Sequence, residues 1–175
     1  PSRGLADVYK RQVNKVIFKE KGLSTLKPRK IWFDDTVQRL NVDERGDLLG
    51  EFKPDDDLLV VQQSGNLKIV PPDLNMHFPE DMIILEKADR AKPISVAYFN
   101  KKKKKYFVKR FILGLLKGNQ TFISNHKDDV VEIVSTDWKP LIEVVTKNKK
   151  IVDRYNLNLF EFISVKGIKA IGNQL

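Results

Sequence analysis

The sequence predicts an all-β fold assembled from repeated hairpins. Pairs of short segments rich in β-forming residues begin near Leu58, Ile94 and Val130, so successive hairpins lie 36 residues apart. Turn-forming residues separate these segments, and no apolar period of 3.6 residues is sustained along the chain. Short hairpins that repeat every ~35–50 residues are typical of bladed, propeller-like proteins. We therefore expect several small antiparallel sheets and no long helix.

Two hairpins are expected in the N-terminal half. They are, in chain order, Lys30–Phe33 with Val37–Leu40 across an Asp34-Asp35 turn, and Leu58–Gln62 with Leu67–Val70 across a Ser64-Gly65-Asn66 turn. Pro71-Pro72 ends the last of these strands, because proline has no N–H to donate to a neighbouring strand.

Two further hairpins are expected in the C-terminal half. They join Ile94–Phe99 to Tyr106–Leu113 across a lysine run, and Val130–Ser135 to Leu141–Thr146 across a turn near residues 137–140. The connection 74–84 is where we expect a helical turn. Residues 1–22 fit a short helix or a strand equally well.

Composition excludes several classes of site. The chain has 175 residues, 41% of them hydrophobic, which is enough to bury a core. It has no cysteine, so disulfides, thiolate metal sites and a cysteine nucleophile are excluded, and only two histidines, His77 and His126. No apolar run approaches the ~20 residues of a membrane span, and the N-terminus does not read as a signal peptide. Because the sequence does not begin with Met, we expect it to be part of a longer protein.

Charge is distributed unevenly along the chain. Residues 1–90 hold 15 Lys+Arg and 16 Asp+Glu, whereas residues 91–175 hold 17 and 7, a net charge of +10. Residues 43–90 are acidic, with 12 Asp+Glu against 5 Lys+Arg. Such a basic half predicts a polyanionic partner, which an acidic surface elsewhere would repel.

The lysine run at residues 101–105 is the centre of the contacts that we expect with a nucleic-acid backbone. By itself the run also fits a solvated hairpin tip or a nuclear-import signal. In the strand that follows, Lys109 shares a face with Phe107 and Phe111, so we expect its ammonium group to reach the edge of a buried face, while Arg110 projects from the other face. The candidate phosphate contacts are Lys101, Lys102, Lys103, Lys104, Lys105, Lys109, Arg110, Lys117, Lys147, Lys149 and Lys150.

No catalytic, metal or cofactor site is predicted. Asp55-Asp56-Asp57 is interpreted as a turn before a strand, because consecutive strand residues point to opposite faces and chelate poorly. Tyr155 follows Arg154, a pairing that would suit a DNA-cleaving tyrosine, but no carboxylate cluster surrounds it in the sequence, so we expect a packed aromatic. No glycine-rich nucleotide loop is present.

The stretch from Lys30 to Phe111 resembles the C-terminal region of the A subunit of bacterial type IIA topoisomerases. The segments that carry the resemblance are KIWFDDTVQRLNVDERGDLLGEF, DDDLLVVQQSGNLKIVPPD and ISVAYFNKKKKKYFVKRF, in that order. The final segment, FISVKGIKAIGNQL, is similar to the closing segment of topoisomerase IV A subunits. Gyrase A subunits carry a Gln-Arg-Arg-Gly-Gly-Lys-Gly box, which this sequence lacks, so topoisomerase IV is favoured.

The resemblance implies a β-pinwheel of about three to four four-stranded blades that exchange strands with their neighbours. It implies a connecting segment at residues 1–22 and a DNA-binding domain at residues 23–175 that binds and bends duplex DNA for an ATP-dependent topoisomerase, without a catalytic site or cofactor of its own. The implied partners are duplex DNA, the remainder of the A subunit and the ATPase B subunit, in the cytoplasm at the nucleoid and not at a membrane. The alternative is a propeller-like protein-interaction module that uses the acidic 43–90 surface.

Overall fold

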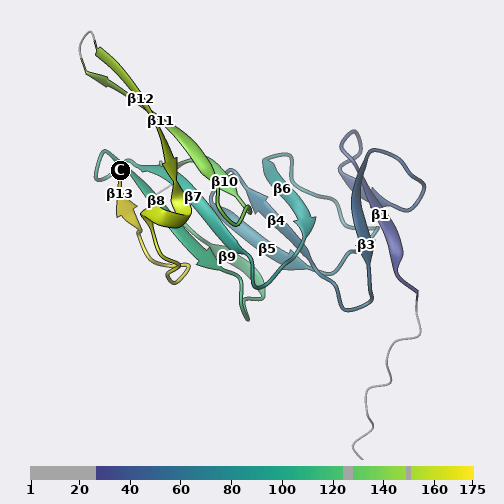
Figure 1. The fold of residues 1–175 in the computed structure, drawn as a ribbon. Helices are drawn as coiled ribbons and strands as arrows, with labels where there is room; N and C mark the ends of the chain where they lie inside the picture. The colour runs from purple at the N-terminus through teal and green to yellow at the C-terminus, as the bar shows by residue number, and fades with distance from the viewer. Residues whose placement is uncertain (1–26, 124–127, 149–150) are drawn as a thin grey trace, which may run out of the picture.

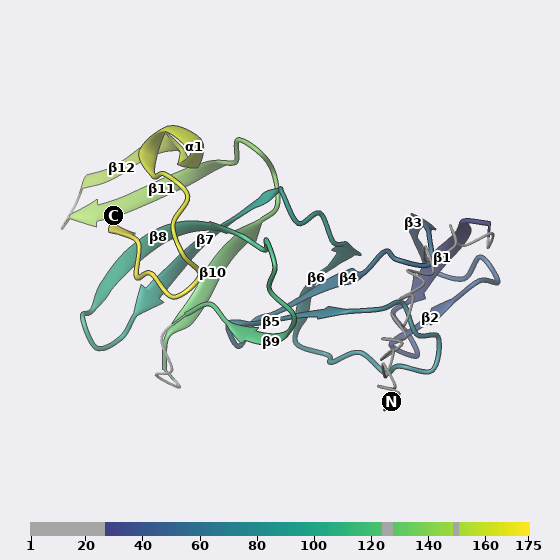
Figure 2. The same ribbon diagram turned by 90° about the horizontal axis from the view of Figure 1, so that it is seen from below.

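Four antiparallel sheets follow one another along an elongated molecule (Figure 1; Figure 2). The computed structural model describes residues 27–123, 128–148 and 151–175, and in this part of the chain one short helix accompanies the strands. The prediction of a mostly β protein is therefore confirmed. The expectations for residues 1–22 lie outside the described residues.

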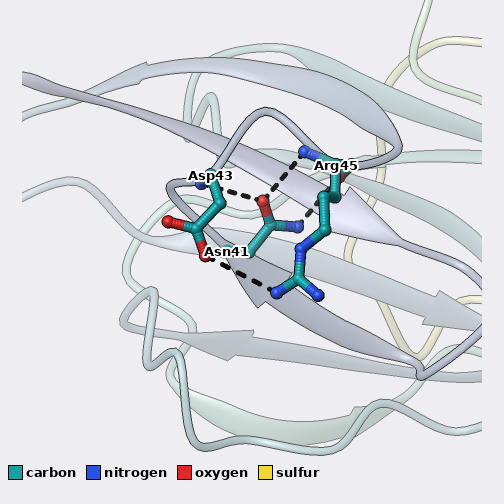
Figure 3. A network of polar contacts seen from close by, with 3 residues as sticks. All are labelled: Asn41, Asp43 and Arg45. Atoms are coloured by element: carbon teal, nitrogen blue, oxygen red, sulfur yellow. Dashed lines mark hydrogen bonds and ion pairs between the residues drawn. The ribbon is translucent and has the colours of Figure 1, made fainter.

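The first sheet has the strand order β2-β1-β3. Its strands are β1 (Arg29–Asp34), β2 (Arg39–Asn41) and β3 (Asp47–Phe52). The loop from β2 to β3 is held by the buried amide of Asn41, whose oxygen accepts the backbone N–H groups of Asp43 and Arg45 at 3.1 Å each (Figure 3). The Asn41 amide nitrogen donates to the Arg45 carbonyl at 2.8 Å. A single side chain thus satisfies the backbone of the loop.

The second and third sheets each have four strands. The second has the order β6-β4-β5-β9, with β4 (Leu58–Gln62), β5 (Asn66–Val70), β6 (Met82–Lys87) and β9 (Gly118–Thr121). The third has the order β10-β7-β8-β13, with β7 (Pro93–Asn100), β8 (Lys105–Ile112), β10 (Val130–Ser135) and β13 (Asn173–Gln174). The segment expected to hold a helical turn, 74–84, contains no helix, and its last three residues belong to β6.

The fourth sheet is the hairpin of β11 (Leu141–Asn148) and β12 (Ile151–Asn158), which extends from the third sheet (Figure 1). The helix α1 (Leu159–Phe162) follows directly. Asn158 caps its first turn by accepting the backbone N–H of Phe160 at 3.0 Å, and Leu159 is fully buried. The cap and the buried leucine fix the end of β12 against the third sheet.

One pairing rule repeats in the first three sheets. Each of these sheets is built around one hairpin, and the strand that follows the hairpin in the chain pairs with the hairpin's first strand. The hairpin's second strand pairs with a segment that comes later, after the hairpin of the next sheet. In the second and third sheets this exchanged strand is β9 or β13, and in the first it is a single bridge from His77 to Arg39. The two exchanged strands share the sequence Gly-Asn-Gln, at residues 118–120 and 172–174. Each of these three sheets is therefore completed by a segment from farther along the chain.

Apolar side chains fill three interiors between consecutive sheets. Strand β4 serves two of them, because Leu58 and Val60 enter the cluster shared with the first sheet while Leu59 and Val61 enter the cluster shared with the third. A smaller cluster joins β7 and β8 to the β11–β12 hairpin and α1 through Ile142 and Leu159, among others. Because the second and third sheets are covered on both faces, their central strands are nearly continuous apolar runs.

One sequence prediction about pairing needs correction. Val130–Ser135 and Leu141–Thr146 do form strands, but not a hairpin with each other: β10 pairs with β7, and β11 pairs with β12. The physical reason is that β10 buries Val131 in the interior between the second and third sheets, while Ile142 of β11 packs in the next interior. The expected hairpins 58–70, 94–113 and 30–40 are confirmed.

Candidate nucleic-acid interface

The lysine run forms the exposed turn between β7 and β8. Asn100 pairs with Lys105 across the hairpin, and all five lysines from Lys101 to Lys105 are exposed. The backbone N–H of Lys104 donates to the Lys101 carbonyl at 3.3 Å, which closes the turn. We call residues 101–105 the lysine turn.

Few of these lysines are neutralised. Lys101 lies 3.7 Å from Asp128, in an exposed ion pair that contributes little in water. Lys103 lies over the ring of Phe107, and Lys105 donates to the side-chain oxygen of Gln174 at 2.9 Å. Within the described part of the chain, Lys102 to Lys105 make no ion pair, so their charges are available to an external anion.

Lys109 lies in the interior, which corrects the expectation that it reaches the edge of the sheet. Its side chain is 2% exposed, and its ammonium group donates to the carbonyls of Phe122 and Ile168. Burial lowers the pKa of Lys109 to about 8. The exchanged strand β9 and the segment that leads to β13 enclose Lys109 from two sides, and this enclosure was invisible in the local alternation of the sequence.

Arg110 does project from the opposite face, as expected, but that face is also buried. Its guanidinium group donates to the Ser95 hydroxyl at 3.1 Å and to the Trp138 carbonyl at 3.0 Å, and it stacks over Phe160. Burial lowers the pKa of Arg110. Since Arg110 is 3% exposed, it is a structural cation and lies away from any surface that a duplex could reach.

The remaining candidates divide between two places. Lys147, near the end of β11, is exposed and lines a groove of about 600 Å³ together with Tyr106, which directly follows the lysine turn. Both views show the β7–β8 turn and the far end of the β11–β12 hairpin at the same end of the molecule (Figure 1; Figure 2). Lys117 is exposed beyond the opposite end of β8, about 25 Å of strand from the lysine turn. Lys149 and Lys150 lie outside the described residues.

The final strand adds a contact that sequence reasoning missed. The side chain of Asn173 accepts a hydrogen bond from Lys166 at 3.2 Å, and its neighbour Gln174 holds Lys105. Strand β13 pairs with β8, so these two exposed lysines lie along the edge of the same sheet. The repeated Gly-Asn-Gln sequence is the signal that would have identified β13 as a strand.

The acidic region is partly neutralised within the molecule. Asp56 lies 2.6 Å from Lys87, and Asp57 lies 2.7 Å from Arg90. Although burial opposes it, hydrogen bonding to Lys87 lowers the pKa of Asp56. The Asp55-Asp56-Asp57 sequence forms the expected turn before β4 and holds the backbone N–H of Lys53 at 2.6 Å. These carboxylates serve local structure.

Within the described ranges, no three His, Asp or Glu side chains come together in a group that could hold a metal ion. Tyr155 is 47% exposed, which corrects the expectation of a packed aromatic, and Arg154 beside it lies 3.6 Å from Glu143. No helix in the described ranges is long and apolar enough to cross a membrane.

Comparison with known families decides the relationship. The family described as topoisomerase C-terminal domain, Bacteroidota, matches residues 39–175, more than three quarters of the chain. The chain belongs to this family. This topoisomerase C-terminal domain is thus part of a topoisomerase, an enzyme that acts on DNA, and the match runs from β2 to β13 and includes the lysine turn, whereas β1 precedes it. No curated protein and no solved structure matched the chain.

Proposed function

We propose that this topoisomerase C-terminal domain binds duplex DNA through backbone phosphates, and that the lysine turn is the centre of the contact. The observation that carries the proposal is five consecutive exposed lysines, four of them without an ion pair among the described residues, in a domain of a DNA enzyme. Lys147, which shares a groove with Tyr106, and Lys166, which bonds Asn173 of β13, extend the proposed surface. Lys117, Lys149 and Lys150 stay in the proposal as further contacts, whereas buried Lys109 and Arg110 are removed from the proposed surface.

Contacts of this kind position the duplex without reading its sequence, because phosphates are the same at every base pair. Bending a duplex by tens of degrees costs ~1–6 kcal/mol, so several lysines must act together. The domain would hold a DNA segment for the enzyme and bias which DNA geometry it accepts. No catalytic step is assigned to the domain.

The more specific parts of the proposal rest on the resemblance. The pairing rule, in which each sheet receives a strand from beyond the next hairpin, supports a strand-exchanged β-pinwheel of about three to four blades. The absence of the glycine-rich basic box supports topoisomerase IV and bending rather than full wrapping. The proposed protein partners are the remainder of an A subunit and an ATPase B subunit. The proposed location is the nucleoid in the cytoplasm.

The test is the salt dependence of duplex binding by the domain. Each neutralised phosphate contributes a slope of about −0.9 to log K against log salt, so we expect a slope steeper than about −3. A slope near zero would contradict the proposal. The alternative, a protein-interaction module using the acidic 43–90 surface, predicts binding to a basic protein partner and no salt-dependent binding to plain duplex DNA.

A further inference from the structure

The lysine turn contains a strained backbone position. In all three hairpins of the first three sheets, the last residue before the second strand has a left-handed conformation: Gln38 with φ of 54°, Gly65 with φ of 82° and Lys104 with φ of 52°. Glycine adopts this conformation without cost, whereas the Cβ of other residues clashes with the backbone. Lys104 therefore keeps a charged side chain where glycine would be easier to accommodate, and something must hold the turn in this shape.

Two buried polar side chains hold it from below. Asn100, the last residue of β7, accepts the backbone N–H of Lys103 at 2.8 Å and donates to Asp129 at 3.0 Å. Asp129, in the segment just before β10, accepts the backbone N–H of Lys101 at 2.9 Å. Asn100 is 6% exposed and Asp129 is 9% exposed. The turn is thus fixed by one side chain from β7 and one from the segment just before β10.

The loop after β2 shows what an asparagine achieves by itself. There Asn41 binds three backbone groups of its own loop, while the exposed carboxylate of Asp43 pairs with the Arg45 side chain (Figure 3). The lysine turn adds the carboxylate of Asp129, which satisfies a backbone donor and offsets the mutual repulsion of five adjacent ammonium groups. The Asp129 carboxylate also repels DNA. A site that bound DNA through net charge alone would be stronger without this carboxylate.

We propose that Asn100 and Asp129 are positioning residues, which fix the lysine turn, strained Lys104 included, in one shape that meets successive phosphates of a duplex. This inference rests on the proposed function. A turn ordered before binding loses less conformational freedom when the duplex arrives, and the saving appears as affinity. Asp129 would thus strengthen DNA binding through geometry although its charge weakens it.

The experiment compares Asp129→Asn with Asp128→Asn in duplex-binding titrations at several salt concentrations. Both substitutions remove one negative charge, but Asp128 is exposed, and its ion pair among the described residues is with the side chain of Lys101. We expect Asp128→Asn to bind as tightly as the wild type or more tightly, and Asp129→Asn to bind on the order of fivefold more weakly. If Asp129→Asn binds as tightly as Asp128→Asn, the inference is overturned.

A third variant covers the case in which Asp129→Asn does not fold. Asn100→Ala leaves net charge unchanged and removes the acceptor for Lys103, so affinity should fall about fivefold while the salt slope stays at its wild-type value. Wild-type affinity in Asn100→Ala would overturn the inference and leave the proposed function intact. A wild-type domain with a salt slope near zero would instead overturn the proposed function, and this inference with it.

Discussion

Lys109 and Arg110 are neighbours on β8, and their side chains enter two different interiors of the molecule. The Lys109 ammonium group binds the carbonyls of Phe122 and Ile168 between the second and third sheets. The Arg110 guanidinium group binds Ser95 and the carbonyl of Trp138 on the opposite face. Neither cation has an ion-pair partner among the described residues, so both are held by neutral oxygen atoms and by an aromatic ring.

These two cations join segments that are distant in the sequence. Phe122 directly follows the exchanged strand β9, and Ile168 precedes β13, so Lys109 connects both exchanged segments to β8. Arg110 connects β8 to β7 and to the segment that leads into β11. The central strand of the third sheet thus uses positive charge for assembly, while the turn that precedes it presents positive charge to solvent.

Reversing charge in the lysine turn should weaken DNA binding without unfolding the domain. The triple variant Lys103→Glu, Lys104→Glu, Lys105→Glu replaces three exposed cations, so we expect the slope of log K against log salt to become shallower by about three. The measurements are duplex titrations over a range of salt and thermal unfolding of the free domain.

The matched control reverses three exposed lysines of the near-neutral half, Lys30, Lys53 and Lys68. The change in net charge is identical, so the control separates a local site from a general charge effect. We expect most of the salt slope to survive in the control. Equal losses in the two triple variants would show that the lysine turn has no special part in binding.

Lys109→Met should destabilise the fold and leave the salt dependence of DNA binding unchanged. The methionine fills the space but cannot donate, so the carbonyls of Phe122 and Ile168 lose a partner, at a cost of about 1–3 kcal/mol. Urea unfolding gives the stability, and duplex titration gives the slope. A shallower slope in this variant would place Lys109 in the DNA contact after all.

The pKa of Lys109 predicts a pH dependence of stability with a definite sign. Burial lowers the pKa from 10.5 to about 8, so between these values the unfolded chain binds a proton that the folded chain has lost. The free energy of unfolding should therefore rise with pH between about 8 and 10 on account of Lys109, and this contribution should be lost as pH falls through 8. The contribution of Lys109 is the free energy of unfolding of the wild type minus that of Lys109→Met, each measured in urea over this pH range. If this difference stays constant or falls as pH rises, Lys109 is not a buried titrating lysine.

Gly172→Ala should detach the final strand. Gly172 has φ of 97°, and a Cβ at this position would lie 2.1 Å from the Val108 carbonyl oxygen, a backbone atom that cannot move aside without breaking β8. We expect a loss of about 2–4 kcal/mol, with faster hydrogen exchange at Asn173 and Gln174. Gly167→Ala is the matched control, since a Cβ there meets nothing within 4 Å. Similar stability of the two variants would argue against the pairing of β13 with β8.

Local sequence predicted the hairpins well because a hairpin is a local structure. Leu58–Gln62 and Leu67–Val70 pair across a turn whose Gly65 is left-handed, so both the strands and their register follow from nearby residues. The same reasoning paired Val130–Ser135 with Leu141–Thr146 and was wrong. Proximity in sequence does not decide between two neighbours when each strand has an apolar face that belongs to a different interior.

The candidate site was predicted in part for a similar reason. Five consecutive charges at a hairpin tip must be exposed, because the free energy needed to bury them all is far larger than the stability of the fold. The exposure of the lysine turn was therefore predictable. The buried amide and carboxylate beneath the turn were not predicted, because Asn100 and Asp129 are 29 residues apart and nothing local connects them. Their contact exists because β10 pairs with β7.

By itself, then, the sequence determined a mostly β protein of repeated hairpins, a strongly basic second half and an exposed lysine turn, since these follow from composition and from residues close together along the chain. The tertiary structure alone decided which strands are exchanged between sheets and which cations face solvent. Lys109 and Arg110 are cations like Lys101 to Lys105, but other segments cover them, and these segments arrive from up to 59 residues away, as Ile168 does over Lys109. Burial depends on contacts between distant segments, and no local pattern of charge and hydrophobicity encodes it.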